Sequence, residues 1–384
     1  MSLCLVGLDN LPVLAPEYRA HAIGGESVQQ TLLAKALARR GHEVSMVTAD
    51  HGQEDGAVCG RIRVYKAYRP AAGLPLLRFV HPRWTGLWSA LARADAQLYY
   101  TSCAGMHLGL LALYCARHRR RLVFRCASDS DCDPARLLIR YARDRWLYRY
   151  GLRRADVILV QNAAQAASLR QHFGLSGRLA GMLVERTPAN AARDIDVLWV
   201  GNIRQVKRPE RLLALAAQLP EAQIHMVGGP VADEAALFER IRREAASLPN
   251  LTFHGHRSYW DTNTLYGRAR LLVNTSDLEG FPNAFLQSWI RGVPVVSFTD
   301  PDDLIRRHGL GEAVSSAGAM RDAIRRLLRD AEAHGAAAQR CRAYMTREHA
   351  EERVLAPYLT AFEELTRNPR AAPPLAAADE RPRA

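Results

Sequence analysis

The chain has 384 residues, 48% of them hydrophobic, and a formal net charge of +13. This length fits two α/β domains of ordinary size, each able to bury its own core. No apolar stretch reaches the roughly 18 residues that a membrane span needs, and no basic leader precedes the first strand, so we expect neither a transmembrane nor a secreted protein. The seven cysteines are an odd number without a Cys-x2-Cys pair, which disfavours a zinc site and favours a reducing cytoplasm.

The first predicted elements are a strand at residues 3–7, a long loop and a helix that follows Gly24 and Gly25. Apolar residues then recur at helical spacing until a second strand begins near residue 43, which makes one βαβ unit. The unit lacks Gly-x-Gly-x-x-Gly, so a nicotinamide or flavin cofactor is not expected. The two glycines fit either a tight turn with positive φ or a close approach of the backbone to phosphates.

Further strands are predicted near residues 61–68, 96–101, 121–126 and 156–160, which completes a doubly wound sheet. Ser128 and Asp129 follow the third of these strands, in a run of alternating aspartates. Such carboxylates can hold a divalent cation, although a loop that caps the next helix near Asp133 explains them as well. Because a separate cationic loop is available for phosphates, no metal is expected.

The positive charge is concentrated between Arg117 and Arg154, where 12 arginines face four aspartates. The part from Arg136 to Arg154 mixes arginines with aromatic and aliphatic residues. This mixture is typical of a helix that rests on an anionic bilayer surface. An ordinary solvated helix and a nucleic-acid contact are the alternatives.

A break in the pattern at residues 185–193 predicts a hinge, and a strand at residues 196–201 follows it. This strand ends at Gly201, and Arg204 and Lys207 follow before a helix begins. Only three of the 52 basic residues are lysines, which makes Lys207 an uncommon choice. A glycine, two cations and a helix start could bind a diphosphate, although plain solvated cations are the alternative and the segment is not a Walker loop.

Strands near residues 223–227, 251–254, 271–274 and 293–297 predict a second parallel sheet. Arg257 lies in the loop after the second of these strands. The carboxyl ends of parallel strands are where open α/β sheets bind ligands, so Arg257 is a candidate ligand contact.

The stretch after residue 274 is the most informative part of the chain. Gly280 and Pro282 force a loop, and Asn283 opens a helix of roughly two to three turns. Glu279 and Gln287 are eight residues apart around this turn, and both can hydrogen-bond the hydroxyls of a sugar-like ligand. The alternative is that Glu279 caps the helix and Gln287 is a solvated side chain.

The stretch Ser-Asp-Leu-Glu-Gly-Phe-Pro at residues 276–282 resembles the retaining glycosyltransferases of GT-B fold, group 1 or family 4. These carry a Glu-x7-Glu motif, and Gln287 replaces the second Glu here. The resemblance implies two Rossmann-like doubly wound α/β domains that face a cleft. The expected segments are an acceptor domain at residues 1–184, a linker at 185–195, a donor domain at 196–350, a helix at 351–368 that packs back on the first domain, and a disordered tail at 369–384.

The resemblance also implies roles for the site residues. Glu279 would lie against the donor sugar, Gln287 at the ribose, and Lys207, then Arg204, against the pyrophosphate. Ser128 stands where many relatives have a histidine, and Asp129 could orient the acceptor hydroxyl. The remaining donor-binding candidates are Gly24, Gly25, Gly201, Arg257, Gly280, Phe281, Pro282 and Asn283.

The implied function is transfer of a sugar from a nucleotide diphosphate sugar to a glycan or lipid-linked acceptor, in polysaccharide, lipopolysaccharide or glycolipid assembly. No cofactor, metal or nucleic-acid partner is expected. A nucleotide-sugar-binding protein without transfer is an alternative, motivated by Gln287 and Ser128, and so is an epimerase or hydrolase of nucleotide sugars.

Overall fold

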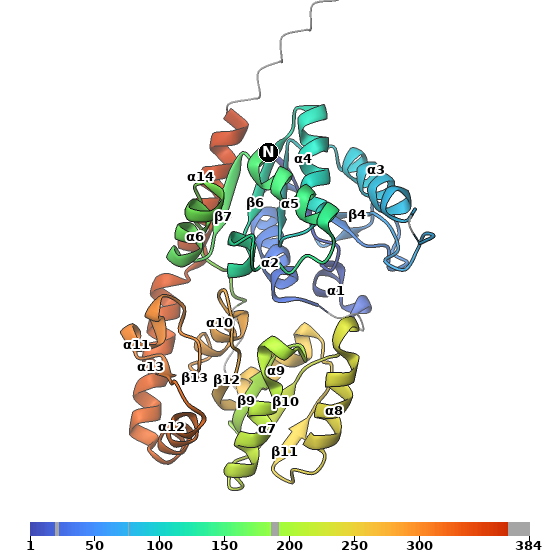
Figure 1. Cartoon of the computed structure of the whole chain (residues 1–384). Helices are drawn as coiled ribbons and strands as arrows, with labels where there is room; N and C mark the ends of the chain where they lie inside the picture. The colour runs from blue at the N-terminus through green and yellow to red at the C-terminus, as the bar shows by residue number, and fades with distance from the viewer. Residues whose placement is uncertain (20–22, 76, 186–191, 368–384) are drawn as a thin grey trace, which may run out of the picture.

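A computed structural model describes residues 1–19, 23–75, 77–185 and 192–367. Of the segments expected from the sequence, most of the linker, at residues 186–191, and the tail lie outside the described residues. The rest of the chain forms two sheets, one in each half (Figure 1). Among the described residues, no helix is both long and apolar enough to cross a membrane.

The first sheet has eight strands in the order β3-β4-β2-β1-β5-β6-β7-β8. All neighbouring strands are parallel except β3 and β4. Its strands are β1 (Ser2–Val6), β2 (Glu43–Thr48), β3 (Val58–Cys59), β4 (Ile62–Lys66), β5 (Leu98–Ser102), β6 (Arg121–Arg125), β7 (Val157–Val160) and β8 (Arg178–Leu179). The helices of this half are α1 (Leu11–Leu14), α2 (Gly25–Arg39), α3 (Thr85–Ala94), α4 (Met106–His118), α5 (Ala142–Arg154) and α6 (Ala163–Phe173), with short helical turns η1 (Pro16–Tyr18), η2 (Phe79–Trp84) and η3 (Asp129–Cys132).

The second sheet has six strands, all parallel, in the order β11-β10-β9-β12-β13-β14. Its strands are β9 (Ile195–Val200), β10 (Ile224–Val227), β11 (Leu251–Phe253), β12 (Ala269–Asn274), β13 (Val295–Ser297) and β14 (Gly311–Ala313). The helices are α7 (Pro209–Gln218), α8 (Ala235–Ala245), α9 (Tyr259–Arg268), α10 (Asn283–Trp289), α11 (Leu304–His308), α12 (Ala317–Arg329), α13 (Ala331–Glu348) and α14 (Glu351–Arg367), with turns η4 (Gln205–Lys207), η5 (Ala232–Glu234) and η6 (Pro301–Asp303).

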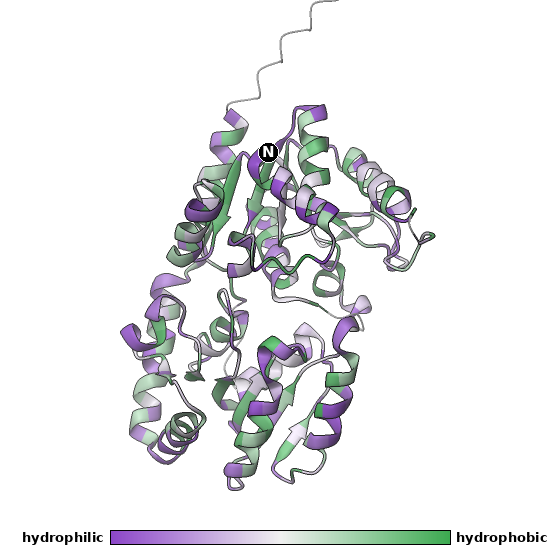
Figure 2. Cartoon of the chain, viewed as in Figure 1, coloured by the Kyte–Doolittle hydropathy of each residue, from purple (hydrophilic) through white to green (hydrophobic). Residues whose placement is uncertain are grey.

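Each sheet is covered by helices on both faces, so its central strands are apolar on both sides (Figure 2). Successive residues of a strand point to opposite faces, and in β1 Leu3 and Leu5 join one core cluster while Cys4 and Val6 join the other. Helix α14 packs beside the first sheet, where Tyr358 lies in the cluster that contains Leu3 and Leu5 (Figure 1).

The expected helix from Arg136 to Arg154 is too long, because α5 begins only at Ala142. Leu137 and Ile139 are buried while Leu138 and Arg140 are exposed, an alternation that belongs to extended backbone and not to a helix. Three further strands, β3, β8 and β14, were not predicted, and each is a short strand at a sheet edge.

Candidate active site

Lys207 and Glu279 form an ion pair at the carboxyl ends of two neighbouring strands. Lys207 Nζ lies 2.6 Å and 2.7 Å from the two carboxylate oxygens of Glu279. Ser276 Oγ and Asn274 Nδ2 also donate to Glu279 Oε1, at 2.6 Å and 3.1 Å. The Glu279 side chain is 9% exposed and that of Lys207 27%. Burial and three donors hold this carboxylate in one orientation, with the ammonium beside it.

Hydrogen bonds between the loops after β9 and β12 fix this pair in place. Thr275 Oγ1 donates to the carbonyl oxygen of Lys207 at 2.8 Å and accepts from Trp199 Nε1 at 2.9 Å. The backbone N–H of Asp277 donates to the carbonyl of Val206 at 3.0 Å. Since β9 and β12 are adjacent strands, these links position both charged groups at the same edge of the sheet.

The other two predicted residues of the phosphate loop, Arg204 and Gly201, contact different neighbours. Arg204 is half exposed and its Nε lies 3.9 Å from a carboxylate oxygen of Glu234. A Cβ at Gly228 would lie 2.2 Å from the Gly201 carbonyl oxygen, so the loops after β9 and β10 touch here, and the phosphate contact expected of Gly201 stays a prediction. At Gly201 itself, the nearest neighbour of a Cβ would be the Trp199 ring, at 3.3 Å.

Gly24 and Gly25 precede and begin α2, and neither has a positive φ, so the tight-turn interpretation is wrong. Gly25 does lie close to another group, but this group is a side chain: a Cβ there would lie 2.4 Å from Asn283 Nδ2 in the other half of the chain. The approach of these glycines to phosphates stays a prediction. Gln29 Nε2, one turn further along α2, donates to Asn283 Oδ1 at 2.6 Å. A Cβ at Gly24 would meet nothing within 4 Å. The start of α2 thus contacts the predicted donor stretch directly.

The loop before α10 also contacts the first half of the chain. The backbone N–H of Phe281 donates to Gln161 Oε1 at 3.0 Å, and a Cβ at Gly280 would lie 2.9 Å from the same oxygen. Pro282 is the residue at the N-cap of α10 and no side chain caps this helix, so the interpretation of Glu279 as a cap is wrong. Gln161 was not predicted as a site residue, although a polar residue directly after the apolar strand β7 was a usable signal.

Gln287 is buried, so the interpretation of it as a solvated side chain is wrong. Its Oε1 accepts from Arg291 Nη1 at 2.9 Å, and Arg291 Nη2 donates to Asn263 Oδ1 at 3.1 Å. These bonds tie α10 to α9, and the ribose contact expected of Gln287 stays a prediction.

Ser128 and Asp129 lie at the start of η3. Ser128 caps this turn together with Asp131, whose carboxylate accepts from the backbone N–H groups of Ala127 and Ser128. Burial raises the pKa of the Asp129 carboxyl, while a hydrogen bond from Gln165 Nε2, 3.1 Å long, opposes this rise. The segment therefore caps a helical turn, but this turn is η3 and not a helix near Asp133, and no side chain caps the next helix, α5. Nowhere in the described residues do three His, Cys, Asp or Glu side chains gather as a metal site would need.

Arg257 is exposed in the loop after β11. In the same loop His256 Nε2 is buried and has no hydrogen-bond partner, and a Cβ at Gly229 would lie 3.0 Å from His256 Nδ1. His254 Nε2 lies 3.0 Å from His225 Nδ1. The loop therefore offers one buried unpaired ring nitrogen and one solvated guanidinium.

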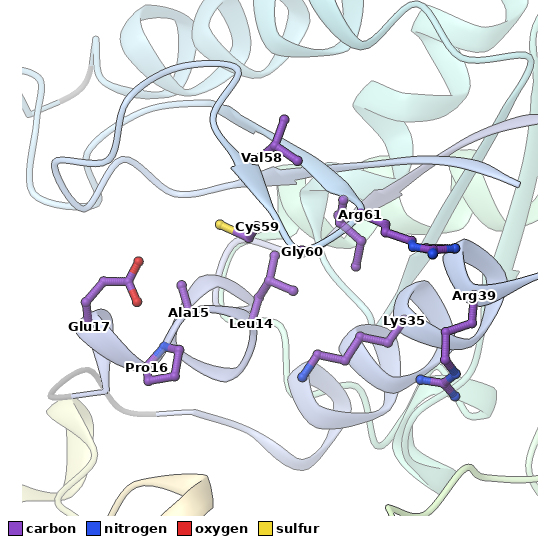
Figure 3. Close-up of a pocket in the computed structure, with 12 residues that line it drawn as sticks. Leu14, Ala15, Pro16, Glu17, Lys35, Arg39, Val58, Cys59, Gly60 and Arg61 are labelled. Atoms are coloured by element: carbon purple, nitrogen blue, oxygen red, sulfur yellow. The ribbon is translucent and has the colours of Figure 1, made fainter. Parts of the chain in front are cut away.

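A hollow of about 500 Å³ lies apart from these residues, between α1, α2 and the β3–β4 hairpin. Lys35 and Arg39 of α2 line it together with Cys59 and Arg61 of the hairpin (Figure 3). It contains none of the predicted donor-site residues.

Two family models match the chain. The model described as Glycosyltransferase Family 4 matches residues 23–180, and that described as Glycosyl transferases group 1 matches residues 194–330. The chain belongs to this group 1 and family 4 class of glycosyltransferases. The second match contains Lys207 and Glu279, and the first contains the start of α2.

The fold is that of GT-B glycosyltransferases. Sucrose-phosphate synthase of Thermosynechococcus elongatus superposes with a TM-score of 0.75 at 20% identity, over 95% of this chain and 99% of that one. HepE of Anabaena, solved in complex with UDP and glucose, gives 0.72 at 16% identity, over 95% and 100%. WaaG, a glycosyltransferase involved in lipopolysaccharide biosynthesis, gives 0.66 at 15% identity, over 94% and 98%.

Among curated proteins, the D-inositol 3-phosphate glycosyltransferase of Mycobacterium tuberculosis is 33% identical over 104 residues. This match covers 26% of the chain and 22% of the relative. The chain thus covers about a fifth of the length of these curated relatives.

Proposed function

We propose that the protein is a retaining glycosyltransferase that moves a sugar from a nucleotide diphosphate sugar to a hydroxyl of a glycan or lipid-linked acceptor. The observation that carries the proposal is the Lys207–Glu279 pair, held by Ser276 and Asn274 at the carboxyl edge of the second sheet. A cation for phosphate and a carboxylate for sugar hydroxyls lie side by side there.

Departure of the nucleotide increases negative charge on its phosphate, so a cation at that point stabilises the transition state more than the ground state. In our proposal Lys207 exchanges its bond to Glu279 for one to the diphosphate, and Glu279 then accepts from hydroxyls of the sugar. Arg204 supplies a second cation, because its guanidinium is half exposed and held only at 3.9 Å by Glu234. Asp129 orients the acceptor hydroxyl, and a phosphate oxygen takes the acceptor proton in front-face transfer, so no general base is assigned.

The comparisons support the two substrates of this proposal. HepE was solved with UDP and glucose, and WaaG is named for lipopolysaccharide biosynthesis. We therefore propose a role in polysaccharide, lipopolysaccharide or glycolipid assembly. All seven cysteines are free thiols, which supports a cytoplasmic location, with the segment from Arg136 to Arg154 at the inner face of the membrane.

The proposal is tested by calorimetric binding of UDP-, GDP- and ADP-sugars to the wild type and to Glu279→Ala, followed by release of the free nucleotide. We expect selective binding that the substitution weakens, and NMR of the product should show the donor's anomeric configuration. Binding without nucleotide release in the presence of glycan acceptors would favour a nucleotide-sugar-binding protein. No binding by any member of the panel would remove the donor-site assignment.

A further inference from the structure

Large apolar side chains on the described surface gather in two segments of the first half. Of the exposed large hydrophobic residues, only Val58 and Leu179 lie elsewhere in the part of the chain that is described. Single exposed apolar residues are common on proteins, whereas a cluster of them indicates a binding surface. The clustered residues are 50% to 78% exposed and comprise Leu74, Leu77, Val80, Leu138, Tyr141 and Trp146, which we call the apolar face.

The two segments that carry the apolar face are adjacent in space, although about 60 residues separate them in the sequence. The Arg143 guanidinium lies over the ring of Phe79, 3.6 Å from its centroid. Phe79 also packs against the core cluster that contains Leu137 and Ile139. The inward side chains of both segments therefore share one core, and their outward side chains share one surface.

Helix α5 cannot roll to bury its exposed Trp146. A Cβ at Gly109 of α4 would lie 2.5 Å from the Leu147 carbonyl oxygen, and a Cβ at Gly151 of α5 would lie 2.6 Å from the backbone of Leu108. The two helices thus touch backbone to backbone. On a neighbouring face of α5, Trp146 stacks on Tyr150 with ring centroids 5.6 Å apart. Trp146 is held outward, 61% exposed.

The charge around the apolar face is almost entirely positive. Residues 136–154 contain seven arginines, all exposed, and residues 74–84 contain Arg78 and Arg83. Asp144 is the only acidic residue of these two segments, and it pairs with Arg143 at 2.8 Å. Figure 2 shows α5 mostly in the hydrophilic colour, in contrast to the strands behind it.

We propose that the apolar face and its arginines dock on an anionic lipid surface. Leucine, valine and tryptophan side chains enter the boundary between headgroups and acyl chains, while guanidinium groups bind lipid phosphates. Nucleic acid would satisfy the arginines but would leave the exposed Leu74, Leu77 and Leu138 without an apolar partner. A second copy of the chain would bring two strongly positive surfaces together, which costs free energy. The proposal adds Leu74, Leu77 and Val80 to a membrane contact otherwise placed on residues 136–154, and it does not depend on the transfer reaction.

Co-sedimentation of the full chain with vesicles tests this surface. We expect binding to phosphatidylcholine vesicles that contain phosphatidylglycerol, weaker binding to pure phosphatidylcholine, and a decrease with added salt. The double variant Leu138→Ser/Trp146→Ser should lower the partition coefficient about tenfold or more, because two apolar side chains no longer enter the lipid. Leu74→Ser/Leu77→Ser should lower it as well.

The matched control is Val58→Ser/Leu179→Ser, which removes two apolar side chains, 57% and 56% exposed, from other places and should bind like the wild type. All six positions are exposed, so melting temperatures should stay close to that of the wild type. Equal loss in the control, or no binding of the wild type to anionic vesicles, overturns the proposal. Unchanged binding by Leu74→Ser/Leu77→Ser overturns the inclusion of residues 74–80, and RNA binding without vesicle binding overturns the choice of lipid.

Discussion

Lys207 and Glu279 are 72 residues apart in the chain, yet the lysine ammonium donates to both oxygens of the glutamate carboxylate. Their contact depends on the order of strands in the second sheet, which places β9 beside β12. The carboxylate has two further donors, whereas the ammonium has Glu279 as its one partner among the described side chains and is the more exposed of the two. The lysine is therefore the group free to turn toward a phosphate.

Replacing Glu279 or Lys207 with alanine should lower kcat/KM by about 10² to 10³, the usual effect of removing a group that stabilises developing charge. The double variant should lose little more than either single one, because the two residues act as a unit. Arg204→Ala should cost less, since Arg204 is half exposed and contacts Glu234. Steady-state nucleotide release measures all four, and strictly additive losses would contradict a joint role.

The contact between Gly25 and Asn283 predicts a coupling between the two halves of the chain. Gly25→Ala should displace the Asn283 side chain and break its bond to Gln29. In an Asn283→Ala background this clash is absent. Gly25→Ala should therefore lower the free energy of unfolding by about 1 kcal/mol less there than in the wild type. Urea unfolding of the four proteins in this cycle measures the difference.

Gly24→Ala is the matched control for that cycle, because its Cβ would meet no atom within 4 Å. We expect no coupling between Gly24 and Asn283. An equal coupling for both glycines would show that the effect arises from the flexibility of glycine and not from the contact.

A buried ion pair anchors the start of α2 behind Gly24 and Gly25. Arg125 Nη1 donates to both oxygens of Glu26, at 2.8 Å and 2.7 Å, and the Arg125 side chain is fully buried. Arg125→Met should lower the free energy of unfolding by about 3 to 5 kcal/mol, because it leaves Glu26 buried without its partner. Adding Glu26→Leu should recover much of this loss.

The exposed pair of Arg178 and Glu364 provides the comparison for that experiment. Its side chains are 51% and 49% exposed, so Arg178→Met should cost no more than about 1 kcal/mol. Chemical denaturation of both variants checks the contrast, and a similar cost for the two would count against the importance of burial.

His254 predicts a pH dependence of stability. Burial, His225, Arg257 and Arg268 lower the pKa of His254 to about 4, below the value of about 6.5 in an unfolded chain. Between these values the unfolded chain binds more protons, so this residue's contribution to stability is present above about pH 6.5 and is lost as the pH falls toward 4. His254→Gln should make the fall in the free energy of unfolding between pH 6.5 and 4 less steep. Denaturation of both proteins at several pH values measures this slope. A fall of the same steepness in the variant would assign it to other groups.

The long strands were predictable because each is a continuous apolar run that ends at glycine or a polar residue. For example, the run that ends at Asn274 is β12, within two residues of the predicted start. The unpredicted strands β3 and β8 have only two residues, too few to show a pattern, and β14 is Gly-Glu-Ala, without a large apolar side chain. The helix expected to begin at Arg136 was misread because exposed arginines hid the alternation of Leu137 and Ile139.

The contacts between the predicted site residues depend on the order of strands in the fold, which the spacing of residues in the sequence does not determine. Glu279 and Lys207 were both named, but their direct contact requires the strand order. Gln29, which holds Asn283, was missed because a glutamine on an apolar helix resembles ordinary surface. Gln161, which holds Phe281, was missed although its position directly after β7 was a usable signal. The bond between Gln287 and Arg291 was within reach, since residues four apart on a helix are neighbours.

The packing of α14 on the first sheet also sets an order of assembly. A ribosome delivers the eight strands of that sheet first, but Val354, Leu355, Tyr358 and Phe362 of α14 complete its core. Until those residues emerge, an apolar surface of the first half has no cover. The half that is synthesised first therefore cannot complete its core until nearly the whole second half has been made.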